Sequence, residues 1–126
     1  MQRRDFEKLV EEALESIPKD FRDAIRNMAI VVEDEPSDEL LDDMEIEPEG
    51  TLLGLYQGTP LPERSWSETA ALPDRVTLFQ GPIEDVGEEE GDIVKVIGET
   101  LIHELGHYFG LSEDEIEQIE ERYWRS

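Results

Sequence analysis

The two histidines of this chain lie four residues apart, in the stretch HELGHYFGLSE at residues 103–113. On an α-helix, side chains at this spacing project from the same face, so His103 and His107 can direct a ring nitrogen at one point. Two imidazoles so placed suit Zn²⁺, which accepts nitrogen ligands in tetrahedral geometry. Glu104, rotated by about 100° from His103, would flank that point and could take a proton from a bound water. The pattern predicts zinc-assisted hydrolysis with Glu104 as the general base.

A zinc site of this kind needs a third protein ligand. Gly110 allows a sharp turn just after the helix, so a residue about one turn further on can come back towards the metal. Glu113 is the expected ligand, with Asp114 or a water as the alternatives. An acid in the first turn of a helix is also favoured by the helix dipole alone. Glu113 could therefore serve only its own helix, and this alternative stays open.

A different interpretation of the motif is a buried helix that carries two core histidines. Two desolvated imidazoles one turn apart would need partners for their N–H groups. Burial of the Glu104 carboxylate on an apolar helix would also cost folding free energy, which is hard to explain if Glu104 has no function. Both considerations favour the metal site over the core interpretation.

Acidic residues dominate the composition, with 34 Asp and Glu against 11 Lys and Arg and a formal charge of −23 at pH 7. This charge either serves solubility alone or attracts cationic proteins, basic peptides or divalent metals, and it repels nucleic acids and anionic membranes. No apolar run reaches the ~18 residues of a membrane span. There is no cysteine for disulfides or thiolate ligands, and the first residues do not resemble a secretory signal. We therefore expect a cytoplasmic protein without nucleic acid or membrane as a partner.

Hydrophobic periodicity predicts the elements that must position the motif. Helices are expected at residues 5–17, 18–26, 92–109 and 112–124, and strands at residues 28–33, 52–57 and 75–80. The helix at 92–109, with Asp92 as its N-cap, is apolar nearly all round, so we expect it to be central and buried. Gly98 and Gly106 within it each cost about 1 kcal/mol relative to alanine, which indicates close approach of another element.

Local signals also mark the ends of the last two helices. Gly110 is expected to stop the motif helix in a left-handed conformation. Ser112 and Glu115 match a capping box for the final helix.

The connecting segments are less regular. Residues 35–50 are acidic and are expected to form a solvated loop, with one docked turn around Leu40, Leu41, Met44 and Ile46. Residues 59–74 form a long loop whose Trp66 is expected to cover the core, with a contact to substrate as the alternative. Gly81-Pro82 should break the third strand before a short helical turn within residues 83–91. The order of elements predicts one α+β domain over residues 1–126.

HELGHYFGLSE resembles the zincin signature HExxHxxGxxD, with Glu113 where that pattern has Asp. More widely, the chain resembles the small bacterial minimal zincin family of predicted metallopeptidases. The stretches that carry this resemblance are MAIVVEDEP at 28–36, LLGLYQGTP at 52–60 and LPDRVTLFQGPI at 72–83, together with the motif. The resemblance implies a minimal zincin-like fold, in which a sheet of about three strands packs on helices around a central HExxH helix.

The resemblance also implies peptide hydrolysis, with zinc held by His103 and His107, Glu104 as base and Glu113 as the third ligand. A peptide or protein substrate would add as a strand to an open sheet edge, for which residues 52–57 and 75–80 are equal candidates. Tyr108 is expected to pack rather than stabilise the oxyanion. That role stays open among Tyr56, Tyr123, Arg75 and Arg122.

A second function remains compatible with the sequence. A non-catalytic module could keep the zincin scaffold, with or without metal, and use its acidic surface to hold a protein partner. The charge of −23 and the small size fit both functions.

Overall fold

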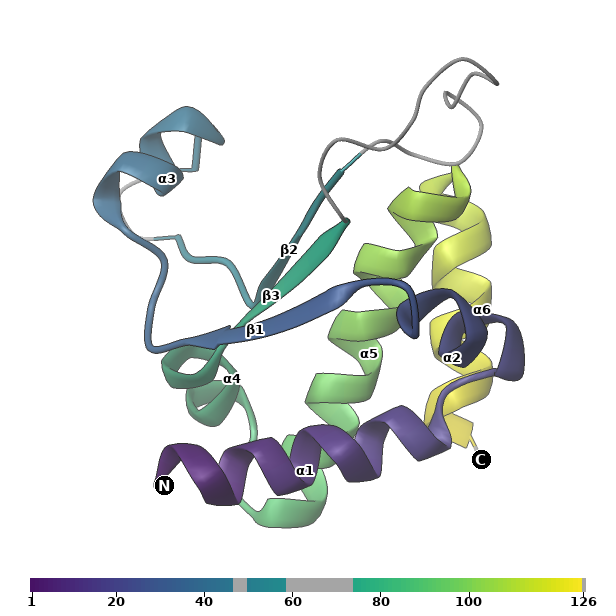
Figure 1. Ribbon diagram of the computed structural model, residues 1–126, viewed down its shortest axis with the longest axis horizontal. Coiled ribbons are helices and arrows are strands. Elements are labelled where there is room, and N and C mark those ends of the chain that lie inside the picture. Colours follow the sequence, from purple (N-terminus) through teal and green to yellow (C-terminus); the bar gives the residue numbers. More distant parts are fainter. Residues whose placement is uncertain (47–49, 59–73, 126) are drawn as a thin grey trace.

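The structure is a computed structural model that describes residues 1–46, 50–58 and 74–125 (Figure 1). It begins with helices α1 (Arg3–Ser16) and α2 (Lys19–Ile25), which Pro18 separates. The apolar stripe of α1 is buried against the long helix α5 (Glu90–Phe109). These helices match the expected ones to within a few residues, because an amphipathic stripe and a proline break are local features.

A three-stranded sheet follows, formed by β1 (Ala29–Glu33), β2 (Gly54–Gln57) and β3 (Arg75–Phe79). The strand order is β1-β3-β2, with β1 parallel and β2 antiparallel to β3. The central strand is thus β3, which excludes residues 75–80 as the open edge. In the part of the chain that the structure describes, β2 has one neighbouring strand, lies at the edge of the sheet, and is in contact with α5.

β2 begins at Gly54, two residues later than expected, and two other segments differ more from expectation. Residues 38–43 form a short helix, α3 (Asp38–Asp43), where a loop was expected, and Ser37 caps it by accepting a hydrogen bond from the Leu40 N–H at 3.1 Å. None of its residues is buried, and Figure 1 shows it standing away from the other helices. The expected docking of this turn is therefore not found, and Met44 is 45% exposed.

The third strand also ends one residue early, because Gln80 begins helix α4 (Gln80–Val86). The side chain of Gln80 is buried; it accepts from Arg3 Nε at 2.8 Å and donates to the Met1 carbonyl at 2.9 Å. These long-range contacts fix the start of α4 before Gly81-Pro82. The helical turn expected within residues 83–91 is thus the second half of this helix. The loop that carries Trp66 lies mostly outside the described residues.

Helix α5 is the centre of the molecule, in contact with α1, α6 (Glu113–Arg125) and β2 (Figure 1). It begins at Glu90 with Glu89 at the N-cap position, so Asp92 lies in its first turn and is not the cap. Gly110 ends it in the left-handed conformation, with φ 74°. The capping box of α6 is confirmed: Ser112 N–H donates to Glu115 at 3.1 Å, and Glu115 N–H donates to Ser112 Oγ at 3.2 Å.

Gly98 and Gly106, inside α5, lie where α6 crosses it. A methyl group at Gly98 would overlap the hydroxyl and ring of Tyr123, and one at Gly106 would lie 2.5 Å from Cγ1 of Ile116. Both partners are buried. The expectation of close approach is confirmed, and the contact holds α6 beside the part of α5 between Gly98 and Gly106. None of the helices in the described ranges is both long enough and apolar enough to cross a membrane.

Replacing Gly98 with alanine is expected to destabilise the fold by about 1–3 kcal/mol, although alanine is the better helix former by about 1 kcal/mol. Tyr123 would have to leave its contacts with Ser16 Oγ (3.1 Å) and the Val94 carbonyl (3.4 Å). Gly91→Ala is the matched control, because Gly91 lies in the same helix with nothing within 4 Å of the added carbon. Chemical denaturation should show Gly91→Ala at least as stable as wild type. Equal stability of the two variants would contradict the close packing.

Candidate metal centre

The C-terminal half of α5 positions three of the four expected site residues. His103 and His107 are about two-fifths exposed, whereas Glu104 is buried at 9% exposure. The imidazole centroids lie 4.9 Å apart, on the helix face that the spacing predicts. The chain then turns at Gly110, and α6 brings Glu113 back to the same point.

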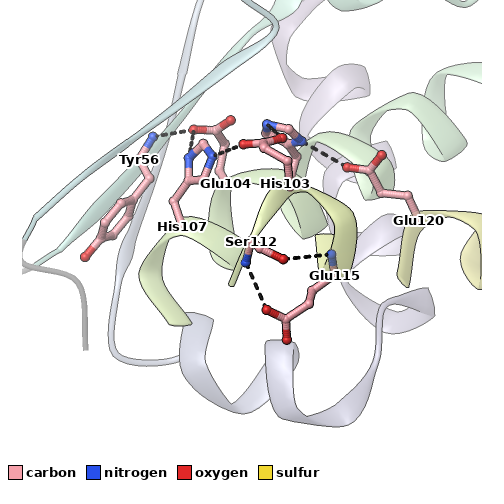
Figure 2. Close-up of polar contacts among 8 residues, drawn as sticks. Tyr56, His103, Glu104, His107, Ser112, Glu115 and Glu120 are labelled. Atoms are coloured by element: carbon pink, nitrogen blue, oxygen red, sulfur yellow. Dashed lines mark hydrogen bonds and ion pairs between the residues drawn. The ribbon is translucent and has the colours of Figure 1, made fainter. Parts of the chain in front are cut away.

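Glu113 meets both histidines at their Nε2 atoms. Its two carboxylate oxygens lie 3.5 Å from His107 Nε2 and 3.9 Å from His103 Nε2. One ligand atom from each of the three residues falls within 4.8 Å of the others. Asp114, the alternative third ligand, does not belong to this group among the residues that the structure describes. Figure 2 shows the two imidazoles side by side above the start of α6.

The geometry of the three side chains can be compared with the size of a zinc ion. Ligands about 2.0–2.2 Å from a tetrahedral zinc lie about 3.4 Å from one another. The two Glu113 oxygens lie 3.5 Å from His107 Nε2 and 3.9 Å from His103 Nε2, and one ligand atom from each of the three residues lies within 4.8 Å of the others, so a small side-chain movement would bring the three to this spacing. Glu113 is 74% exposed, so its side chain can adjust at little cost. Two imidazoles and a carboxylate are also ligands that zinc accepts, so the residues present fit this metal.

Glu104 is held beside these residues by the edge strand. The backbone N–H of Tyr56, in β2, donates to Glu104 Oε1 at 2.9 Å, and the same oxygen lies 3.7 Å from His107 Nδ1 (Figure 2). Burial raises the pKa of Glu104 above its ordinary value, although the Tyr56 N–H and the two imidazoles oppose this rise. A raised pKa favours proton uptake, which a general base requires.

The sequence reasoning missed Glu120. This residue of α6 lies with Oε1 3.0 Å from His103 Nδ1. A carboxylate accepts hydrogen bonds, so the ring hydrogen of His103 belongs on Nδ1 and the lone pair on Nε2, which faces Glu113. Burial raises the pKa of Glu120, and its hydrogen bond with His103 opposes that rise. Its spacing of seven residues from Glu113, two turns along one helix face, was the available signal.

We expect Glu120→Gln to weaken zinc binding by about 10- to 100-fold, the usual cost of losing a carboxylate behind a ligating histidine. The amide still accepts from Nδ1 but no longer raises the basicity of the ring. Competition with a chromophoric chelator measures the change. Glu121→Gln, which removes the same charge from an exposed neighbour, should leave the affinity within about twofold. Equal affinities for the two variants would contradict the role given to Glu120.

The residues considered for oxyanion stabilisation are dispersed. The ring of Tyr108 packs edge-on against Tyr56 at 5.9 Å and Phe109 at 5.1 Å, in line with the packing role expected for it. The Tyr56 hydroxyl donates to the buried Asp74 at 3.0 Å. Tyr123 is enclosed between α5 and α6, away from the metal centre.

The two arginines considered for the same role also lie elsewhere. Arg75 Nε donates to Gln57 Oε1 at 3.2 Å, at the C-terminal end of β2. Arg122 lines a groove with Ser16 and Phe21, at the opposite side of α6 from Glu113 and Glu120. Neither guanidinium is therefore placed at the metal centre.

Comparison with known proteins supports the fold and the class. A profile of the zincin-like metallopeptidase family matches residues 25–123, which include both histidines, Glu104 and Glu113. The chain therefore belongs to the zincin-like metallopeptidase family. No curated protein matches the chain.

Among solved structures, the chain is similar to a conserved hypothetical protein from Thermus thermophilus. The TM-score is 0.57 and the identity 24%, over 86% of this chain and 94% of the other. This likeness extends the fold assignment to nearly the whole length of both chains. The expected α+β, minimal zincin-like architecture is confirmed.

Proposed function

We propose that the chain is a zinc-dependent peptidase that cleaves peptide bonds with Glu104 as general base. The observation that carries the proposal is the convergence of His103, His107 and Glu113 within 4.8 Å, with a buried carboxylate beside them. Membership of the zincin-like metallopeptidase family supports the same chemistry.

The roles of the side chains follow from their positions. His103, His107 and Glu113 would hold the zinc ion, which would supply a water of lowered pKa and polarise the scissile carbonyl. Glu104 takes the proton of the attacking water and delivers it to the leaving amine. The Tyr56 N–H holds the Glu104 carboxylate in place, and Glu120 keeps His103 in the tautomer that presents Nε2.

The edge strand β2 is the proposed platform for the substrate backbone. A peptide added beside β2 would lie next to Glu104, because Tyr56 belongs to that strand and contacts the base directly. β1, the other edge of the sheet, is separated from β2 by β3. The alternative edge considered from the sequence, residues 75–80, is the central strand and cannot serve.

The test combines metal content with cleavage. Protein prepared without chelators should contain one zinc per chain, and it should hydrolyse members of a peptide library in a chelator-sensitive reaction. Glu104→Gln should keep the zinc and lose the cleavage. Bound zinc without cleavage of any peptide would favour the non-catalytic module. A chain that binds no divalent metal at micromolar concentrations would contradict the metal centre itself.

A further inference from the structure

A cavity of about 550 Å³ adjoins the metal centre on the side of His103 and Glu104. It lies between one face of α5 and residues 51–54, which lead into β2, and Glu120 contributes from α6. His107 and Glu113 do not line it. The volume falls within the range of pockets that bind small ligands or side chains. A substrate held along β2 would therefore place a side chain next to the scissile bond in this cavity.

The walls of the cavity are largely apolar. Leu52 and Leu53, from the segment that leads into β2, and Val96 from α5 line it. Val86, at the end of α4, also lines the cavity and is 59% exposed, one of few large apolar side chains in the described part of the chain with so much exposure. Such walls suit a side chain with a long hydrocarbon stem.

The charges that line the cavity are negative. Glu99 and Asp92 project from the same face of α5 as His103, and the lining residues within the described part of the chain include no Lys or Arg. Within the described ranges, no ion pair or side-chain hydrogen bond is found for either acid, and the charge of Glu99 repels that of Glu120, which also lines the cavity. Glu99 is half-buried and lies one helical turn, about 6 Å along the axis, from His103. A carboxylate is thus available within a side-chain length of the reaction site.

We propose that this cavity selects a lysine or arginine side chain of the substrate, adjacent to the scissile bond. The hydrocarbon stem lies against Leu53 and Val96, and the cationic end meets Glu99. Such a side chain combines an apolar stem with a positive head, which matches both the walls and the unpaired acid. This inference rests on the proposed peptidase function and adds the class of substrate. The charge of −23 favours encounter with basic peptides as well, but only a local acid can select the position of the basic residue.

A set of isomeric peptides distinguishes recognition of lysine by the cavity from attraction of any basic peptide by the net charge of the protein. A neutral peptide carrying a single lysine is synthesised with that lysine at each position in turn, so all isomers have the same net charge. Zinc-loaded wild-type protein is expected to cleave each isomer at the bond next to the lysine, always on the same side of it. A second series with arginine in place of lysine should give the same result. Replacing lysine with norleucine should lower kcat/KM by about threefold to tenfold, and glutamate at the same position should abolish cleavage.

Glu99→Gln should reduce the lysine-over-norleucine ratio by about the same factor while cleavage of the norleucine peptide persists. Glu12→Gln is the matched control, because Glu12 is an exposed acid on α1, away from the cavity. It should leave the ratio unchanged. Cleavage without a fixed register, preference for norleucine or an aromatic residue, or an unchanged ratio in Glu99→Gln would overturn the inference.

If the protein is not a peptidase, the results differ from those expected if the cavity does not select lysine or arginine. If wild type cleaves no peptide, binding of the lysine and norleucine peptides to zinc-loaded Glu104→Gln decides the inference by itself. Tighter binding of one lysine isomer, lost in the Glu99→Gln, Glu104→Gln double variant, would support the pocket without the reaction. Equal binding of all isomers would overturn it.

Discussion

Glu104→Gln is expected to lower kcat/KM by about 100- to 10,000-fold, the usual contribution of a general base. The amide is nearly isosteric and still accepts the hydrogen bond from the Tyr56 N–H, but it cannot take a proton from water. Zinc affinity should change little, because Glu104 is not among the three converging ligands. Steady-state cleavage, with zinc content measured on the same samples, tests the prediction. Activity within tenfold of wild type in a fully zinc-loaded variant would remove Glu104 from the role of base.

The same substitution should stabilise the metal-free protein at neutral pH, by about 0.5–2 kcal/mol. Burial raises the folded-state pKa of Glu104 above its value in the unfolded chain. Such a group stabilises the fold at a pH below its unfolded pKa, and this contribution is lost as the pH rises through the folded pKa. At a pH above the folded-state pKa, the wild type keeps a buried, desolvated charge at Glu104, whereas Glu104→Gln has no charge there.

Denaturation of the metal-free proteins at two pH values measures this effect. The advantage of Glu104→Gln should be largest at pH 7 and shrink as the pH falls through the raised pKa. Glu104→Ala is the control, because it also removes the charge but leaves the Tyr56 N–H without this acceptor. It should be less stable than Glu104→Gln. A metal-free Glu104→Gln that is less stable than wild type would show that the charged form is well accommodated.

Much of the helical framework could be predicted because its signals are local. Gly110 adopts the left-handed conformation that its position at a helix end favours, and Ser112 and Glu115 pair as their spacing requires. Gly98 and Gly106 lower the stability of a buried helix, and close packing of another element could compensate for this loss. The prediction of close packing at these two glycines was therefore correct. The positions of His103 and His107 needed only the helical period.

The remaining features depend on contacts between distant segments. The start of α4 is set by Gln80, whose partners Arg3 and Met1 lie at the other end of the chain. Strand order decides which edge is open, and no periodicity encodes it. Glu120 contacts His103 only because α6 folds back onto α5, and this contact cannot be seen in the sequence. The placement of the candidate residues was thus predictable within α5 and directly after its end at Gly110, where Glu113 follows, and not where Glu120 or β2 adds a contact from a distant segment.

Glu113→Ala is expected to weaken zinc binding by at least about 100-fold, beyond the range for a partner behind a ligand. At a zinc concentration well above both dissociation constants, that change removes about 2.7 kcal/mol of zinc-dependent stabilisation. The reason is geometric: the Glu113 carboxylate is the group that faces both Nε2 atoms, at 3.5 and 3.9 Å. Chelator competition gives the affinity, and thermal unfolding with and without zinc gives the stabilisation.

Asp114→Ala separates this role from a purely helical one. Both residues lie in the first turn of α6, where an acid contributes about 0.3–1 kcal/mol through the helix dipole. The two variants should therefore lose similar stability without metal, and only Glu113→Ala should lose the response to zinc. Glu113→Asp keeps the carboxylate on a shorter stem and should retain most of the affinity, because the zincin signature places aspartate there. If Glu113→Ala and Asp114→Ala respond to zinc alike, Glu113 serves its own helix and the third ligand lies elsewhere.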